Sequence, residues 1–300
     1  MTTPFTGVGT ALVTPFTASG ELDEQAVRRL GRRQIDAGIH FLVPCGTTGE
    51  NPTLSDPERV RIVEILVEEA AGKVPVLAGA GGYDTREVIH LASLMKDAGA
   101  AGLLSVTPYY NKPTQEGLFQ HYKAIAESTD LPIIVYNVPG RTGVNIEPAT
   151  LVRLAAIPNI VGVKEASGNI SQMIEICRLV PQDFVVLSGD DAITLPLMAI
   201  GGRGVISVAS NEIPAEMVQM VEAALRGDFA AARAVHHRIA PLMVVNFVEA
   251  NPVPVKSAMA MMGLLEEQYR LPMCPPTAAS KEKIRRVLQD LQLNAPAHAH

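Results

Sequence analysis

Short apolar runs recur along the chain, and each has the length of one buried strand. Eight such runs cover residues 8–13, 41–45, 74–78, 102–106, 133–136, 160–164, 184–188 and 205–208. Between them, apolar residues recur every three or four positions, as in amphipathic helices, most clearly over 22–37, 57–71, 85–98 and 116–128. This alternation predicts an α/β fold with a parallel sheet whose strands are connected by helices.

The number and spacing of these units predict a closed barrel. Eight strand–helix units that recur roughly every 25 to 35 residues are typical of a (β/α)8 TIM barrel. A doubly wound open sheet is the alternative, but it usually has fewer strands and often a glycine-rich first turn. Here the first strand continues into Thr14-Pro15-Phe16. We therefore expect a catalytic (β/α)8 barrel over residues 1–228.

The chain changes character after the eighth apolar run. From about residue 214 onward it contains only helical stretches, including 229–239, 256–265 and 281–291, with proline-rich connectors between them. Such helices cannot complete the barrel. We predict a C-terminal helical domain over residues 229–300 that serves packing and oligomerisation.

Composition and charge exclude several classes of protein. The chain has 300 residues, of which 47% are hydrophobic, so it can form a large core. A net charge of -6 without a long Lys/Arg run argues against nucleic acid or an anionic membrane as a partner. The first residues lack the basic and apolar pattern of a targeting signal, and no stretch resembles a membrane span, so we expect a cytoplasmic protein.

We expect no metal or organic cofactor. Cys45, Cys177 and Cys274 are odd in number and widely spaced, unlike a disulfide framework or a set of zinc ligands. Residues 79–82 resemble a dinucleotide-binding loop, but the third glycine is missing and the loop follows the third strand rather than the first.

Lys164 is the residue that most directly indicates what reaction the protein catalyses. It ends the apolar run 160–164, in a strand that would be buried on both faces and where packing does not call for an amine. Partial desolvation disfavours the charged form of an amine, and a neutral amine can attack a ketone to form an imine. The alternative is a lysine whose head simply reaches the surface from the strand end. Schiff-base chemistry therefore depends on support from other residues.

Further polar residues follow the ends of other strands, where the active sites of parallel barrels lie. Tyr136 ends the fifth run on the same interior face as Lys164, and its phenol could exchange protons with an imine. Thr47 and Thr48 precede a glycine in a turn that suits a carboxylate, unless they only shape that turn. Arg141 follows a Pro-Gly turn and suits a second carboxylate, although a surface ion pair would also explain it.

At these motifs the chain resembles the dihydrodipicolinate synthase family of class I aldolase-like pyruvate lyases. The resemblance runs nearly end to end, and its marks are residues 46–50 (GTTGE), 106–113 (VTPYYNKP), 136–143 (YNVPGRTG), 162–166 (GVKEA) and 188–191 (SGDD). It implies a (β/α)8 barrel with a C-terminal helical domain, in a homotetramer built from tight dimers. It also implies a lyase that condenses pyruvate with L-aspartate 4-semialdehyde in the diaminopimelate route to lysine.

The resemblance also implies a role for each catalytic residue. Lys164 would form the imine with pyruvate, and Tyr136 would give and take the proton. Thr48 and Tyr110 would complete a proton relay with Tyr136, with Tyr110 reaching in from the neighbouring subunit. Thr47 and Thr48 would hold the pyruvate carboxylate.

For substrate binding, the resemblance implies that Arg141 holds the carboxylate of the semialdehyde and that Gly189 and Ile206 line the pocket. Relatives of the N-acetylneuraminate lyase and 2-keto-3-deoxygluconate aldolase types share the lysine and the tyrosine but generally lack the arginine. Such an aldolase is the alternative function. A catalytically silent keto-acid sensor is a further alternative, against which the retained lysine, tyrosine and threonines argue.

One site departs from the family pattern. In members that lysine inhibits, the resemblance places a feedback site at the tight dimer interface, formed in part by a serine, two histidines and an asparagine. The corresponding residues here are Asn51, Asp56, Arg59 and Tyr83, whereas Glu87 and Tyr109 match. We therefore expect free L-lysine to inhibit weakly or not at all.

Overall fold

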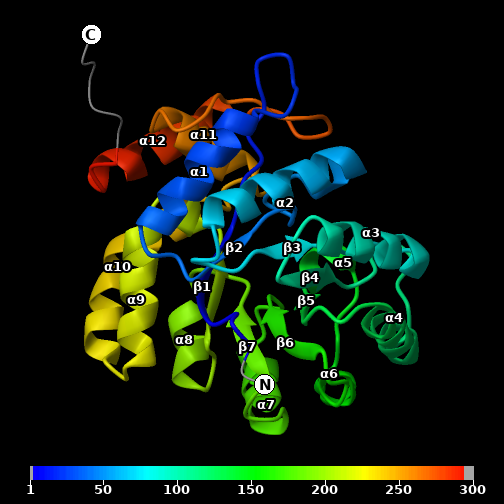
Figure 1. Ribbon diagram of the computed structural model, residues 1–300. Helices are drawn as coiled ribbons and strands as arrows, with labels where there is room; N and C mark the ends of the chain where they lie inside the picture. The colour runs from blue at the N-terminus through cyan, green and yellow to red at the C-terminus, as the bar shows by residue number, and fades with distance from the viewer. Residues whose placement is uncertain (1–2, 294–300) are drawn as a thin grey trace.

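The computed structural model describes residues 3–293, and a barrel of eight parallel strands forms its centre (Figure 1). The strands are β1 (Gly7–Ala11), β2 (Phe41–Val43), β3 (Leu77–Gly79), β4 (Gly102–Val106), β5 (Ile133–Asn137), β6 (Ile160–Glu165), β7 (Val185–Ser188) and β8 (Gly204–Ser207). They pair in the order β2-β1-β8-β7-β6-β5-β4-β3. A parallel bridge between Leu42 and Val76 joins the two ends of this order. The predicted barrel is confirmed, and the open sheet is wrong.

Helices connect the strands and surround them. They are α1 (Glu24–Asp36), α2 (Asp56–Ala70), α3 (Thr85–Asp97), α4 (Gln115–Ser128), α5 (Pro139–Thr142), α6 (Pro148–Ala155), α7 (Ile170–Leu179) and α8 (Thr194–Ala199), with 3-10 turns η1 (Asn51–Thr53) and η2 (Ala209–Asn211). Several helices begin at a capping residue whose side chain accepts a hydrogen bond from a backbone N–H in the first turn. These residues are Asp23, Asp84, Thr114 and Asn169.

Most strand ends differ from the predicted ranges by one or two residues, and for the third and second strands the local cause is clear. The third was expected at 74–78, but its pairing with β4 begins only at Leu77. Pro75 has no N–H to donate, and its carbonyl instead accepts a hydrogen bond from Leu42 N at 3.0 Å. The second strand was expected to reach Cys45, but Cys45 has a φ of 57° and starts the following turn.

Up to residue 293, the C-terminal region contains four helices: α9 (Pro214–Leu225), α10 (Phe229–Val245), α11 (Val253–Met261) and α12 (Ala278–Asp290). Helices α9 and α10 pack side by side on one flank of the barrel (Figure 1). Helix α11 was expected over 256–265, but it ends earlier because Gly263, with a φ of 73°, stops it. The boundary between residues 228 and 229 remains a prediction, and residues 294–300 of the predicted domain lie outside the described part.

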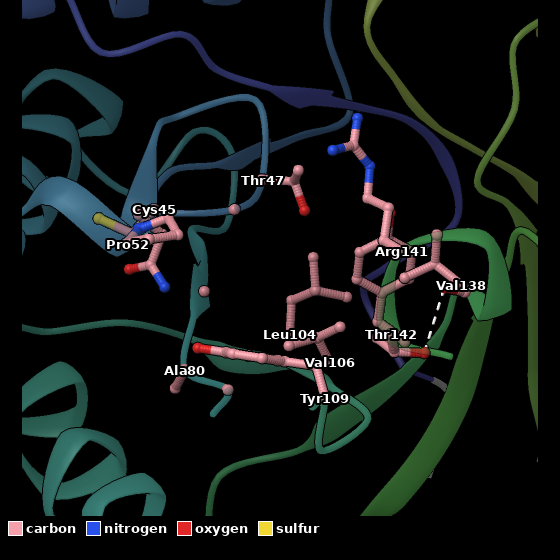
Figure 2. Close-up of a pocket in the computed structure, with 15 residues that line it drawn as sticks. Cys45, Thr47, Pro52, Ala80, Leu104, Val106, Tyr109, Val138, Arg141 and Thr142 are labelled. Carbon is pink, nitrogen blue, oxygen red and sulfur yellow. Dashed lines mark hydrogen bonds between the residues drawn. The ribbon is translucent and has the colours of Figure 1, made fainter. Parts of the chain in front are cut away.

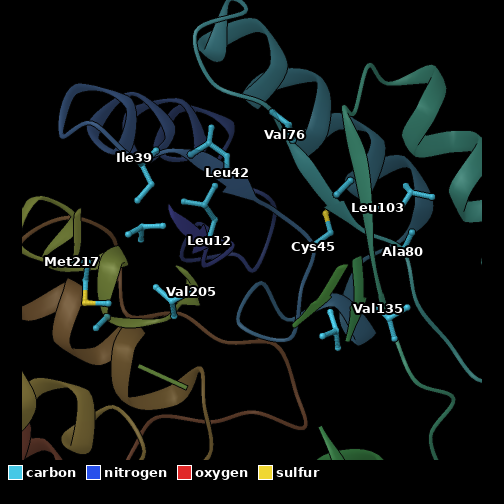
Figure 3. Packing of buried hydrophobic residues seen from close by; sticks show 14 of the residues in the cluster. Leu12, Ile39, Leu42, Cys45, Val76, Ala80, Leu103, Val135, Val205 and Met217 are labelled. Atoms are coloured by element: carbon cyan, nitrogen blue, oxygen red, sulfur yellow. The ribbon is translucent and has the colours of Figure 1, made fainter. Parts of the chain in front are cut away.

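The core has two layers, because side chains alternate along each strand. Ile134 and Tyr136 belong to the cluster inside the barrel. Val135 belongs to the other cluster, between the strands and the helices, part of which Figure 3 shows. Phe5, which precedes β1, fills the barrel near the start of β4. Gly102 leaves room for it, since a Cβ on Gly102 would lie 2.6 Å from the Phe5 ring. Within residues 3–293, no helix combines the length and the apolar character needed to cross a membrane.

A buried ion pair joins α11 to the turn after β2. The Nζ atom of Lys256 lies 2.5 Å from Oε1 of Glu50 and also donates a hydrogen bond to the Thr14 carbonyl at 2.9 Å. Both side chains of the pair are almost fully buried. Burial lowers the pKa of Lys256, and the Glu50 carboxylate opposes that shift. This lysine had no place in the sequence interpretation, although it is more deeply buried than Lys164.

Replacement of Lys256 by methionine tests this connection. Lys256→Met keeps most of the side-chain volume but leaves the Glu50 carboxylate buried without its counter-ion, which should cost about 3–5 kcal/mol in the free energy of unfolding. Urea denaturation monitored by circular dichroism measures the loss. The double variant Lys256→Met/Glu50→Gln removes both charges and should recover part of it. A loss that is equal in the single and the double variant would show that the charge pair does not stabilise the fold.

Candidate functional site

A cavity of about 120 Å³ lies where β2, β5, β6 and β7 end, and residues of the C-terminal region cover part of it. Its lining residues are Thr47, Thr48, Tyr136, Val138, Arg141, Lys164, Ala166, Gly189, Asp190, Val208, Phe247 and Asn251. A second cavity of about 210 Å³ adjoins it toward β3 and β4 and shares Thr47, Tyr136, Val138 and Arg141. Figure 2 shows Arg141 and Val138 on one side of this second cavity and Cys45, Pro52 and Ala80 on the other.

Lys164 and Tyr136 are held together by strand pairing. They are direct partners in the register of β6 and β5, and both are buried. The Lys164 Nζ lies 4.1 Å from the centroid of the Tyr136 ring. Gly189 gives the lysine stem its space, since a Cβ there would lie 3.1 Å from Lys164 Cε. The prediction that the amine and the phenol face each other inside the barrel mouth agrees with this geometry.

Lys164 has no paired carboxylate among the described residues. Among residues 3–293, no carboxylate oxygen lies within 4.0 Å of its Nζ, although the residue is only 5% exposed. This separates it from Lys256, whose ammonium is paired with Glu50. A surface lysine, which was the alternative interpretation of Lys164, does not match this burial. The amine of Lys164 therefore lies at the cavity without a carboxylate partner among these residues.

The two threonines lie in the turn after β2, across the cavity from the strand ends of β5 and β6. Thr48 is buried, and its Oγ1 accepts a hydrogen bond from Asn251 Nδ2 at 3.0 Å. Thr47 is partly exposed and lines both cavities. Both residues therefore share the cavity with Lys164, as the sequence predicts.

Arg141 lies on the short helix α5 and lines both cavities. Its Nη2 atom donates a hydrogen bond to the Asn251 carbonyl at 3.2 Å. Within the described part of the chain, no carboxylate lies within ion-pairing distance of it. The surface ion pair that would have explained this arginine is therefore not formed among these residues, and the guanidinium faces the cavities with donors to spare.

Two predicted site residues lie elsewhere. Tyr110 is 91% exposed, has a φ of 71°, and lines neither cavity. The fold of one chain therefore does not bring it to the site. Ile206 on β8 is fully buried in the barrel interior, in the same cluster as Tyr136 and Leu187. Its predicted contact with substrate stays a prediction.

Two buried side chains near the site, those of Cys45 and Asp191, have raised pKa values. Burial raises the pKa of Cys45, which lines the second cavity, to about 12, so its thiol stays protonated and unreactive. Asp191 accepts hydrogen bonds from the backbone N–H groups of Val208 and Ala209, at 3.0 and 2.9 Å. Burial raises the pKa of Asp191, and these hydrogen bonds oppose that shift. Within residues 3–293, no cluster of three His, Cys, Asp or Glu side chains is suited to a metal ion.

Sequence interpretation missed the contribution of the C-terminal region to this site. Phe247 and Asn251 line the cavity, yet both lie far along the chain from the barrel motifs. Asn251 was seen only as part of a proline-rich connector. The sequence carries no local signal that would link it to residue 48, because their contact depends on how α10 and α11 are placed.

Comparison with known proteins agrees with the geometry. The model of the dihydrodipicolinate synthetase family matches residues 4–291. A 4-hydroxy-tetrahydrodipicolinate synthase of Koribacter versatilis is 53% identical over 282 residues, which cover 94% of each chain. One from Syntrophus aciditrophicus is 52% identical, over 96% of this chain and 99% of the relative.

Solved structures give the same result. The dihydrodipicolinate synthase of Aquifex aeolicus has 45% identity and a TM-score of 0.95, covering 97% of this chain and 99% of that one. The enzyme of Thermotoga maritima has 48% identity and a TM-score of 0.95, with 97% and 100% covered. On its sequence, its fold and the residues that line its cavity, this chain belongs to the dihydrodipicolinate synthetase family.

Proposed function

We propose that this chain carries out the reaction of its 4-hydroxy-tetrahydrodipicolinate synthase relatives: it condenses pyruvate, bound as an imine of Lys164, with L-aspartate 4-semialdehyde. The observation that supports this best is the buried Lys164 amine, which has no paired carboxylate among the described residues and lies beside the Tyr136 phenol. The reaction belongs to the diaminopimelate route to lysine.

The residues around the cavity can perform each step. The Lys164 amine attacks the pyruvate ketone, water leaves, and an imine remains. Loss of a proton from the methyl carbon gives an enamine, which attacks the aldehyde carbon, and the resulting alkoxide takes up a proton. The amino group of the semialdehyde then adds to the imine carbon and the Lys164 amine leaves, which closes the ring and frees the enzyme. Tyr136 exchanges these protons, passing them through Thr48. Thr47 and Thr48 hold the pyruvate carboxylate, and Arg141 holds that of the semialdehyde.

The exposed Tyr110 supports an oligomeric enzyme. In our proposal two chains form a tight dimer in which each Tyr110 completes the relay of the neighbouring subunit, and two dimers form a homotetramer in the cytoplasm. The 91% exposure of Tyr110 in one chain leaves its hydroxyl available for this role. Gly189 gives the lysine its space, and in this proposal Gly189 and Ile206 line the substrate pocket.

An aldolase of the N-acetylneuraminate lyase or 2-keto-3-deoxygluconate aldolase type is the second candidate. It would use the same lysine and tyrosine. Arg141 argues against it, because a guanidinium at the cavity is suited to a partner with its own carboxylate. A coupled assay with pyruvate and the semialdehyde, run beside N-acetylneuraminate and 2-keto-3-deoxygluconate, tells the two candidates apart.

Lys164→Ala tests the nucleophile. Wild type incubated with pyruvate and borohydride should gain the mass of a reduced adduct at Lys164, because borohydride reduces an imine to a stable amine. Lys164→Ala should show neither adduct nor turnover and should keep its fold. The control Lys123→Ala removes an exposed lysine and should behave as wild type. Trapping that persists in Lys164→Ala would assign the imine to another residue.

Arg141→Leu tests the choice of the second substrate. Loss of a hydrogen bond between charged groups costs about 1.5–3 kcal/mol, so kcat/KM for the semialdehyde should fall roughly 10- to 150-fold. Pyruvate trapping should stay unchanged, since Arg141 does not hold pyruvate in this scheme. Arg153→Leu, which removes an arginine paired with Glu116 on the surface, is the control. An equal loss for both substrates would make Arg141 a structural residue.

The pocket that corresponds to the lysine feedback site differs in charge and hydrogen-bonding groups from the site of the family members that lysine inhibits. It has a volume of about 410 Å³ and is lined by Asp56, Arg59, Gly81, Gly82, Tyr83, Asp84, Glu87, Val88, Leu91 and Tyr109. Nη1 of Arg59 lies 2.8 Å from Oδ1 of Asp56, so the Asp56 carboxylate, one of three that line the pocket, is already paired. The Tyr83 ring packs edge-on against Tyr109 at 5.3 Å. The ammonium groups of a diamino acid in this pocket would be repelled by the Arg59 guanidinium, which carries the same charge.

Free L-lysine should therefore inhibit weakly. Initial rates at fixed pyruvate and rising lysine concentration measure this. Half-inhibition should need more than about 1 mM lysine, which corresponds to less than about 4 kcal/mol of binding free energy. Tighter inhibition would show that this different set of residues has rebuilt the site.

A further inference from the structure

We propose that Asn251, in the connector between α10 and α11, is a positioning residue for this reaction: it orients the hydroxyl of Thr48 and holds the guanidinium of Arg141 at the cavity. The proposal rests on the proposed function, because it assigns the residue a place in the same proton relay and the same substrate subsite.

Asn251 contacts both functional groups at once. It is 4% exposed and lines the same cavity as Lys164. Its side-chain Nδ2 donates to Thr48 Oγ1 at 3.0 Å, and its backbone carbonyl accepts from Arg141 Nη2 at 3.2 Å. One residue of the C-terminal region thus connects the proposed relay with the proposed carboxylate subsite.

The hydrogen bond from Asn251 to Thr48 restricts where the hydroxyl hydrogen of Thr48 can point. A hydroxyl has one hydrogen and two lone pairs, and it rotates to suit its partners. When Asn251 donates to the oxygen of Thr48, one acceptor position is filled and the Thr48 hydrogen must point to another group. The Tyr136 oxygen, on the same cavity, is the group that the proposed mechanism requires. Without Asn251 the hydroxyl would sample several orientations, and proton transfer would slow.

The Glu50–Lys256 ion pair keeps this contact in place. Glu50 lies two residues after Thr48, and Lys256 lies in the first turns of α11, just after Asn251. The turn after β2 and the start of α11 are thus joined twice, once by the ion pair and once by the Asn251–Thr48 hydrogen bond. A contact held at two adjacent points has little freedom to shift, as a positioning role requires.

Two variants of Asn251 and one control test the proposal. Asn251→Asp has the same shape but can only accept hydrogen bonds when ionised, and Asn251→Ala removes the amide. Asn246→Ala is the control: Asn246 is also fully buried, but its amide donates to Glu212 rather than to a cavity residue. Four quantities are measured for each: borohydride trapping of pyruvate, exchange of the pyruvate methyl protons in D2O by NMR, the KM of the semialdehyde, and the melting temperature.

We expect all three variants to trap pyruvate. Both Asn251 variants should slow methyl-proton exchange by about tenfold or more, since this step depends on the relay and not on the second substrate. The KM of the semialdehyde should rise in Asn251→Asp, because the new carboxylate competes for Arg141, and should change little in Asn251→Ala, which keeps the backbone carbonyl that Arg141 contacts. Asn246→Ala should lower the melting temperature and leave exchange unchanged.

A double-mutant cycle separates action through Thr48 from a general disturbance. In a Thr48→Val background, Asn251→Ala should slow exchange little further, because the group that it orients is gone. If Thr48→Val and Asn251→Ala each slow exchange and their effects add in the double variant, the proposal is overturned. Exchange at the wild-type rate in Asn251→Asp would also overturn it. If wild type itself neither traps pyruvate nor exchanges its methyl protons, it is the proposed function that fails, and the two failures are thus distinguishable.

Discussion

Closure of eight parallel strands into one ring is the constraint on which the rest of this structure depends. Because every strand runs in the same direction, all the carboxyl ends meet at one rim, and polar residues that are far apart in the sequence come within contact distance there. The register between β5 and β6 then fixes Tyr136 directly opposite Lys164. The barrel interior below this pair is filled by apolar side chains, so the amine and the phenol stand at the boundary between a dry core and an open cavity.

The two buried lysines show how one fold uses the same side chain in two ways. Lys256 has a carboxylate at 2.5 Å and a backbone carbonyl at 2.9 Å, so its charge is satisfied and it connects segments of the chain. Lys164 has an aromatic ring beside it and glycine on the neighbouring strand end, so its stem is enclosed while its head is left without an anion among residues 3–293. Burial alone therefore does not mark a reactive lysine. In our proposal, the partner of the amine decides whether a buried lysine has a structural or a chemical role.

The C-terminal helices do more than cover the barrel. Their first connector reaches the rim between the turn after β2 and helix α5, and there it touches the residues to which both carboxylate subsites are assigned. The stability of the ion pair and the geometry of the cavity are consequently linked. A substitution on α11 can alter the site without touching the barrel, which is why this region cannot be treated as a passive support.

The order of strands and helices could be predicted from the amino-acid sequence alone, because apolar runs and helical periodicity reflect burial that is repeated along the chain. It also singled out Lys164, Tyr136, Thr47, Thr48 and Arg141, since each lies at or just after a strand end that the barrel places at its rim. The start of β3 and the end of α11 differ from the prediction because Pro75 has no N–H to donate and Gly263 adopts a left-handed backbone conformation. At these two positions the backbone outweighs hydrophobicity. Only the tertiary structure revealed Asn251, the Glu50–Lys256 pair and the exposed position of Tyr110. These depend on contacts between segments about two hundred residues apart, or on which surface one chain leaves uncovered, and no local pattern encodes either.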